Sequence, residues 1–164
     1  GKHNLSNAVI AMYAASLHGI SPKDSFLALK NSKGVKRRFE TVFQNDHKIV
    51  IDDFAHHPTA ISNTVQAATN YFPSKRILGI IELASNTMSQ GHHGEDLYES
   101  ASALGKAYWL NLSSQKNKEF EYDSIKLLLT DLEKDIDNFD VILIMSNKDS
   151  KKISEPIIDL IKNK

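Results

Sequence analysis

The sequence predicts an α/β protein whose mainly parallel sheet is covered by helices on both faces. In the second half of the chain, short apolar segments alternate with helical patterns, which is typical of parallel strands joined by crossover helices. Before them, two extended segments flank Asn45-Asp46-His47, a turn-forming cluster that predicts an N-terminal β-hairpin. We therefore expect a Rossmann-like architecture, although no Gly-x-Gly-x-x-Gly follows any predicted strand and that dinucleotide fingerprint is absent.

Two helices are expected before the hairpin. The first spans Leu5–Leu17, where apolar residues recur at helical spacing. The second begins at Ser21-Pro22, with serine as N-cap and proline at the first helical position, and stops near Asn31–Gly34. We place a domain boundary where the pattern changes from helical to extended, which divides the chain into residues 1–36 and 37–164.

The second part then follows a regular order of elements. The predicted hairpin strands are Arg38–Gln44 and Lys48–Asp52. Further strands are expected over Arg76–Glu82, Ala107–Leu112 and Asp140–Met145, and helices over Thr59–Tyr71, Leu97–Gly105, Asp123–Ile136 and Ile153–Ile161.

Composition narrows the class of protein. With 20 Lys and Arg against 20 Asp and Glu, the formal net charge is zero, and we expect neither a nucleic-acid nor a membrane partner. The absence of cysteine excludes disulfides, thiolate catalysis and cysteine-ligated zinc, and it fits a cytoplasmic protein. The polar segment Gly1–Asn7 does not resemble a signal peptide, and the missing Met suggests a processed, tagged or excised piece.

Two basic or amide-rich clusters are candidates for ligand contacts. Asn4 and Asn7 are three residues apart, so both carboxamides can lie on one helix face and meet an adenine edge or a ribose. Helix capping is the alternative, and spacing alone favours it. In Lys36-Arg37-Arg38 an arginine could pair bidentately with phosphate, although residue type alone favours a solvent-facing basic linker.

Two further clusters follow predicted strands, where ligands bind in open α/β sheets. In Asp52–Thr59 adjacent strand residues point to opposite faces, so one of Asp52 and Asp53 should face the cleft and could accept from ribose hydroxyls. His56-His57 could donate or titrate there, but these histidines and His92-His93 lack a recognised metal spacing, and we expect no metal. Glu82–Met88 could recognise a polar substrate. Capped loops are the alternative for both clusters.

Other kinds of site are excluded by motif. There is no Gly-x-Ser-x-Gly elbow for a nucleophilic serine, and we name no catalytic residue in this chain. There is also no Gly-x-x-x-x-Gly-Lys-[Ser/Thr] loop, so this chain does not cradle a triphosphate by that route.

Taken in order, the clusters resemble the Mur ligase family. The resemblance rests on Gly-x-His-Asn-x-x-Asn, then Arg-Phe-Glu, then Asp-Asp-Phe-Ala-His-His-Pro-Thr, the last being close to the form in members that act on UDP-N-acetylmuramate. The run Ser85-Asn86-Thr87-Met88 is similar to the branch that adds a murein tripeptide. The resemblance covers Gly1–Met88 well and thins after Gly94.

The resemblance implies a three-domain, ATP-dependent ligase. Residues 1–36 would be the tail of the central ATP-binding domain, and residues 37–164 the C-terminal domain that binds the incoming amine. A muramate carboxylate would attack the γ-phosphate of ATP, with Mg²⁺ neutralising charge, and a peptide amine would attack the acyl phosphate. The partners implied are UDP-N-acetylmuramate, the tripeptide L-Ala-γ-D-Glu-meso-diaminopimelate and the remaining domains of the same protein.

Three alternatives stay open. The incoming amine could be L-alanine, the chain could be a non-catalytic nucleotide- or peptide-binding module, or it could be a structural domain without a ligand. If the chain is part of a ligase, we expect no ATP turnover by this chain alone, because the phosphate loop, the magnesium ligands and the UDP-substrate domain would lie elsewhere.

Individual residues match family positions. The resemblance places His3, Asn4 and Asn7 near adenine and ribose, Arg38 on the nucleotide across the domain interface, Asp53 near the ribose, His56 beside the nucleotide, and Ser85, Asn86 and Thr87 at the tripeptide. Two departures stand out. Leu83-Ala84 replaces the usual Pro-Arg, and Lys148–Lys152 replaces a glycine-rich run after Met145-Ser146-Asn147.

Overall fold

The computed structural model describes residues 2–32, 34–83, 94–111 and 120–164. The chain divides into two compact units, residues 1–35 and 36–164. In the part that the structure describes, no helix is long and apolar enough to cross a membrane.

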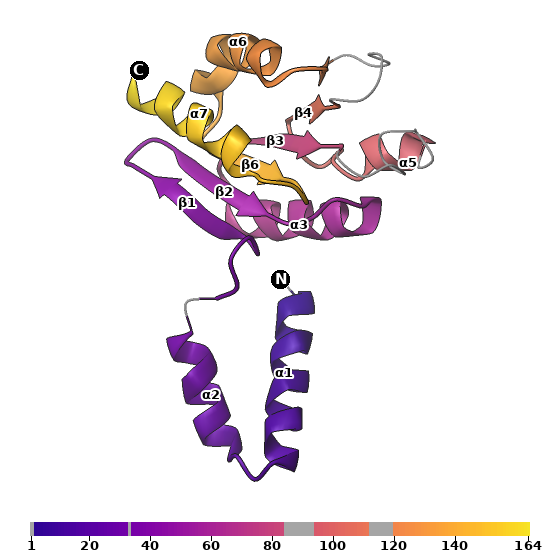
Figure 1. The fold of residues 1–164 in the computed structure, drawn as a ribbon, viewed down its shortest axis with the longest axis vertical. Coiled ribbons are helices and arrows are strands. Elements are labelled where there is room, and N and C mark those ends of the chain that lie inside the picture. The colour runs from indigo at the N-terminus through magenta and orange to yellow at the C-terminus, as the bar shows by residue number, and fades with distance from the viewer. Residues whose placement is uncertain (1, 33, 84–93, 112–119) are drawn as a thin grey trace. The chain divides into compact units, whose positions relative to one another are not determined.

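The first unit is a pair of helices, α1 (Lys2–Leu17) and α2 (Pro22–Asn31), joined by a short turn (Figure 1). Gly19 in the turn has φ +80°, a conformation that favours glycine. As predicted, the Ser21 side chain caps α2 by accepting the Asp24 amide at 3.1 Å, with Pro22 at the first helical position. Large apolar side chains of α1 are exposed: Leu5, Val9, Ile10, Tyr13 and Leu17.

The second unit is built on a six-stranded sheet in the order β1-β2-β6-β3-β4-β5. The strands are β1 (Glu40–Gln44), β2 (Ile49–Asp53), β3 (Ile77–Glu82), β4 (Lys106–Leu110), β5 (Glu121–Tyr122) and β6 (Val141–Met145). Strand β1 pairs antiparallel with β2, and every other pair is parallel. The predicted fold class, including its N-terminal hairpin, is confirmed.

Helices cover both faces of this sheet (Figure 1). One core packs α3 (Pro58–Tyr71) and α5 (Gly94–Glu99) on the sheet, and the other packs α6 (Ile125–Asp135), the 3₁₀ turn Ile136–Asn138 and α7 (Lys151–Lys162). Successive residues of a strand point to opposite faces, so a strand covered on both sides is apolar throughout. Accordingly, all five residues of β6 are completely buried.

Several elements of the second unit differ from the sequence prediction. The helix expected over residues 97–105 ends at Glu99, after which Ser102 and Leu104 donate to carbonyls three residues back in tight turns. The two-residue strand β5 was not predicted, because it is too short to show a period. Strand β1 begins at Glu40 rather than Arg38, because Arg37 and Phe39 have positive φ.

Candidate functional site

Buried polar side chains gather where the central strands end. Asp52 and Asp53 end β2, Glu82 ends β3, and Ser146 follows β6 directly. All four are buried, each with no more than 8% of its surface exposed. Because β2, β6 and β3 are parallel neighbours, their carboxyl ends lie along one edge of the sheet, where ligands bind in open α/β folds.

Asp53 holds three segments together. Its Oδ2 accepts from the Phe39 amide at 2.7 Å, and its Oδ1 accepts from the Ala55 amide at 2.8 Å and Thr64 Oγ1 at 3.1 Å. Both oxygens are thus engaged, and the side chain ties β2 to α3 and to the segment before β1. A buried carboxylate that accepts three donors is strongly stabilised in this position.

Asp52 points to the other face of the sheet, as the alternation of strand residues predicts. Its Oδ2 accepts from Ser150 Oγ at 2.6 Å, just before α7, and lies 3.3 Å from Arg37 Nε. The Arg37 Nε–H direction does not meet hydrogen-bond geometry, so this contact is an ion pair. Among the described residues, Asp52 Oδ1 has no hydrogen-bond partner.

Arg37 connects this carboxylate to the rest of the strand ends. Its Nη2 donates to the Ser146 carbonyl at 2.5 Å, and Ser146 Oγ donates to Glu82 and accepts from the Lys148 amide at 2.9 Å. Sequence reasoning did not single out Arg37. The run Lys36-Arg37-Arg38 indicated a basic cluster, but its sequence does not show which arginine points inward and which is exposed.

Arg38 has the opposite environment. Its side chain is exposed, and the centre of its guanidinium lies 5.6 Å from the centroid of the Phe54 ring. The half-buried His56 contacts the same phenylalanine, with Nδ1 2.9 Å from the Phe54 carbonyl and its ring edge-on to the Phe54 ring at 5.2 Å. No carboxylate within the described ranges pairs with Arg38. An exposed guanidinium of this kind can bind a phosphate bidentately.

The backbone around Arg38 is held in an uncommon conformation. Arg37 has φ 56° and Phe39 has φ 54°, and the left-handed region costs a non-glycine residue about 1–2 kcal/mol. Backbone anchors compensate: Arg37 N donates to Glu40 Oε2 at 2.7 Å, and Phe54 N donates to Arg37 O at 2.9 Å. The Phe39 ring packs against Tyr71 and Phe72. Arg38 therefore projects from a fixed turn.

The structure brings together three of the predicted site residues, Arg38, Asp53 and His56. Asn7 is exposed on α1 in the first unit, and His3 and Asn4 lie in the first turns of the same helix. Ser85, Asn86 and Thr87 lie outside the described residues, as do Ala84 and His92-His93. Searching the described ranges for three or more His, Cys, Asp or Glu side chains that could hold a metal ion finds none.

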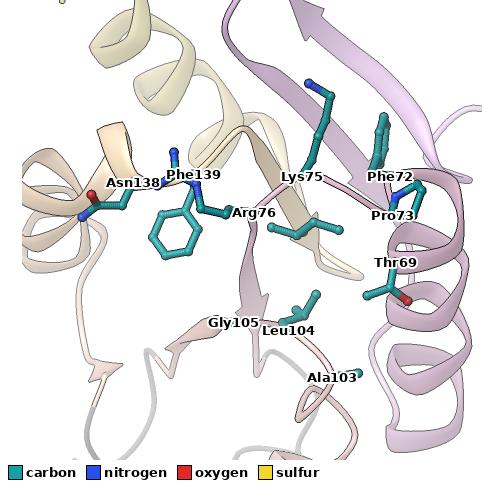
Figure 2. A pocket seen from close by; sticks show the side chains of 11 residues that line it. Thr69, Phe72, Pro73, Lys75, Arg76, Ala103, Leu104, Gly105, Asn138 and Phe139 are labelled. Atoms are coloured by element: carbon teal, nitrogen blue, oxygen red, sulfur yellow. The ribbon is translucent and has the colours of Figure 1, made fainter.

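A pocket of about 550 Å³ lies at the opposite edge of the sheet (Figure 2). It surrounds the start of β3 and has an apolar side formed by Phe72, Leu104 and Phe139. Lys75 and Arg76 lie at it, and the Arg76 guanidinium Nε is 3.7 Å from Asp140. Because this is the amino-terminal edge of the parallel strands, we do not take it as the candidate site.

Comparison with known proteins gives a consistent result. The model of the Mur ligase, glutamate ligase domain matches residues 37–148. UDP-N-acetylmuramate–L-alanine ligase of Christiangramia forsetii is 38% identical over 131 residues, which are 79% of this chain and 28% of that enzyme. UDP-N-acetylmuramate–L-alanyl-γ-D-glutamyl-meso-2,6-diaminoheptandioate ligase of Haemophilus influenzae is 41% identical over 108 residues, 65% of this chain and 23% of that enzyme.

A solved structure extends the match to the whole chain. The murein peptide ligase of Psychrobacter arcticus superposes with a TM-score of 0.75 at 30% identity, covering 100% of this chain and 38% of that protein. The chain thus spans well under half the length of each of these three relatives.

Proposed function

The chain belongs to the Mur ligase family, whose members are ATP-dependent ligases, and we propose that it is part of the ligase that joins UDP-N-acetylmuramate to the tripeptide L-Ala-γ-D-Glu-meso-diaminopimelate in peptidoglycan recycling. In this proposal residues 37–164 are the domain that receives the incoming amine. Residues 1–36 are the tail of the central ATP-binding domain.

The observation that carries the proposal is the position of Arg38. Its guanidinium is exposed at the carboxyl edge of the sheet and lies over the Phe54 ring, which the His56 ring also contacts edge-on. In the proposed site Arg38 binds a phosphate of ATP and His56 lies beside the nucleotide. Asp53 lies near the ribose in this proposal. Its carboxylate also accepts a hydrogen bond from the Phe39 amide. A positive group placed in advance stabilises the charge that develops on a transferring phosphoryl group.

The surface of α1 supports the assignment of the first unit. Leu5, Val9, Ile10 and Tyr13 are all more than half exposed, and with 3.6 residues per turn they share one face of α1. A contiguous exposed apolar face of this kind normally packs against another part of a protein. We propose that these side chains pack against the rest of the ATP-binding domain, where His3, Asn4 and Asn7 face adenine and ribose.

The proposed chemistry proceeds in two steps. The muramate carboxylate attacks the γ-phosphorus of ATP, which forms an acyl phosphate and releases ADP. The amine of the tripeptide then attacks the acyl carbon, forming the amide and releasing phosphate. Among the described residues no group of three or more His, Cys, Asp or Glu side chains could hold a metal ion, and in this proposal Mg²⁺ is bound mainly by other parts of the full-length protein. Ser85, Asn86 and Thr87 are proposed to meet the tripeptide.

A second candidate is the L-alanine ligase of peptidoglycan biosynthesis. The Christiangramia forsetii relative with that name matches over 131 residues at 38% identity. A second observation concerns position 84. Family members that add the tripeptide usually have an arginine there, which could pair with a peptide carboxylate, whereas this chain has Ala84.

The deciding experiment uses the full-length protein with ATP, magnesium and UDP-N-acetylmuramate, offering either the tripeptide or L-alanine. We expect ligated product with the tripeptide only. Product with L-alanine only would replace the proposal by the biosynthetic reaction. No product with either amine would favour a non-catalytic binding module.

The isolated 164-residue chain is expected to turn over no ATP, because Mg²⁺ and most phosphate contacts would be supplied by other parts of the protein. ATP-dependent ligation by this purified chain would contradict the proposal that other parts of the protein supply these contacts.

A further inference from the structure

We propose that Arg37 is a positioning residue, which together with Asp52 orients Arg38 towards the nucleotide. This inference rests on the function proposed above for Arg38. The two arginines are neighbours in sequence but have opposite environments: the Arg37 side chain is turned into the protein and Arg38 is exposed.

Arg37 is held from four directions. Its amide donates to Glu40, its carbonyl accepts from the Phe54 amide, and its guanidinium contacts the Ser146 carbonyl and the Asp52 carboxylate. These partners belong to β1, to β2 and the segment after it, and to the segment after β6. A linker residue that only joined two units would need none of these contacts.

The ion pair is protected from solvent. The side chain of Arg37 is 27% exposed and that of Asp52 only 6%, so solvent and salt screen this attraction less than that of a surface pair. Asp52 is fixed in turn by Ser150 Oγ at 2.6 Å. The planar, forked guanidinium can reach Asp52 and Ser146 at once, which a lysine ammonium cannot reproduce in the same geometry.

Because the turn is rigid, the contacts of Arg37 also fix the direction in which Arg38 leaves the backbone. Positive φ at Arg37 and again at Phe39 fixes the chain direction on both sides of Arg38, and the Phe39 amide is bound by Asp53. Both guanidinium groups lie over the Phe54 ring, at 5.2 Å for Arg37 and 5.6 Å for Arg38. If Arg37 lost its partners, the turn would relax and the Arg38 guanidinium would leave the position set for phosphate.

A double-mutant cycle in the full-length protein tests this. Arg37→Ala, Arg38→Ala and the double variant are compared with the wild type by kcat/KM for ATP. We expect Arg37→Ala to lower kcat/KM by about tenfold to a hundredfold, as displacement of a phosphate-binding group does. In the Arg38→Ala background the same substitution should change kcat/KM by less than about twofold, because residues that act as one unit are non-additive.

The outcomes separate the inference from the proposed function. No effect of Arg38→Ala would overturn the proposed role of Arg38, and the inference with it. A strong effect of Arg38→Ala with an unchanged Arg37→Ala enzyme would overturn only the inference. An equal loss from Arg37→Ala in both backgrounds would show a general structural role and also overturn it.

Two further variants complete the test. Lys36→Ala is the matched control, because Lys36 is an exposed basic residue in the same run, and it should leave kcat/KM unchanged. If Arg37→Ala does not fold, Asp52→Asn replaces it in the same cycle. This variant keeps the side-chain shape and removes the charge that Arg37 faces, so the same loss and the same non-additivity are expected.

Discussion

At the scale of single residues, neighbouring side chains at the strand ends differ in their contacts and in their exposure to solvent. Asp53 binds backbone amides and Thr64, whereas Asp52 faces Arg37 and Ser150. In the same way, Arg37 is anchored inward and Arg38 is exposed. Of these four side chains, both carboxylates are buried, and Arg38 is the exposed one that a ligand can reach.

Replacing Asp53 should destabilise the second unit. In Asp53→Asn one oxygen becomes an NH₂ group that faces a backbone N–H donor, so a buried hydrogen bond to a charged acceptor is lost. We expect a loss of about 2–3 kcal/mol in the free energy of unfolding, measured by urea denaturation of the 164-residue chain. Asp46→Asn, on the exposed hairpin turn, is the control and should change stability by less than about 0.5 kcal/mol. Equal stability of the two variants would contradict this role of Asp53.

Asp135 should contribute to acid sensitivity. Hydrogen bonds from Lys106 and then Tyr108 hold the pKa of Asp135 below its usual range. Because the folded pKa lies below the unfolded one, the contribution is complete above the unfolded pKa and is lost as the pH falls through the folded pKa. Asp135→Asn should therefore flatten the decline of Tm between about pH 5 and about pH 2. The exposed Asp123→Asn should keep the wild-type slope, and identical slopes for both variants would argue against the effect.

At the scale of elements, α7 is held on the sheet by one apolar stripe. Ile153, Ile157 and Ile161 are buried against the sheet, while Ile158 is only partly buried at the edge of the same core. The helix also begins at the polar edge of the sheet, where the Ser150 hydroxyl donates a hydrogen bond to Asp52 and does not cap the helix. Packing of α7 and placement of the loop after β6 are thus coupled.

Truncation of Ile157 should lower the free energy of unfolding more than truncation of Ile158. Ile157 is completely buried, so Ile157→Ala leaves a cavity and should lower the free energy of unfolding by about 2–5 kcal/mol. Ile158→Ala is the matched change at a partly buried position and should cost clearly less. Urea denaturation of both variants checks this, and equal losses would mean that α7 packs in another rotation.

At the scale of the whole molecule, the two units differ in how they are built. The second has an apolar core on each face of its sheet. The first leaves most of the apolar residues of its two helices exposed. In the described part of the first unit, Ser25 is the one buried residue, so its helices gain little from packing on each other.

We expect residues 36–164 to fold without the first unit. This piece should unfold cooperatively in urea and bind less of a hydrophobic dye than the 164-residue chain, because the exposed apolar side chains of α1 and α2 are removed. Circular dichroism and dye fluorescence of both chains check this. A piece that is unfolded, or that binds more dye, would show that the helices protect the core of the second unit.

The fold class and most of the elements could be predicted from local patterns in the amino-acid sequence. Strand and helix periods are local properties, so β2, β3, β6 and the major helices were predicted to within a few residues. Short or irregular elements were not, because β5 and the turns after α5 carry no period. The polar motif at the end of β2 was also visible, since strand ends and residue types can be read locally.

The contacts of each polar residue could not be predicted in this way, because they form between segments that meet only in the folded chain. Arg37 meets a carbonyl 109 residues away, and this contact exists only because β2 and β6 are parallel neighbours. The direction of Arg38 depends on positive φ at Arg37 and Phe39, a conformation that local preference disfavours for these residues and that Asp53, Glu40 and Phe54 hold in place. Local patterns fix periods and residue types, whereas partners and side-chain directions are set by contacts between segments far apart in the chain.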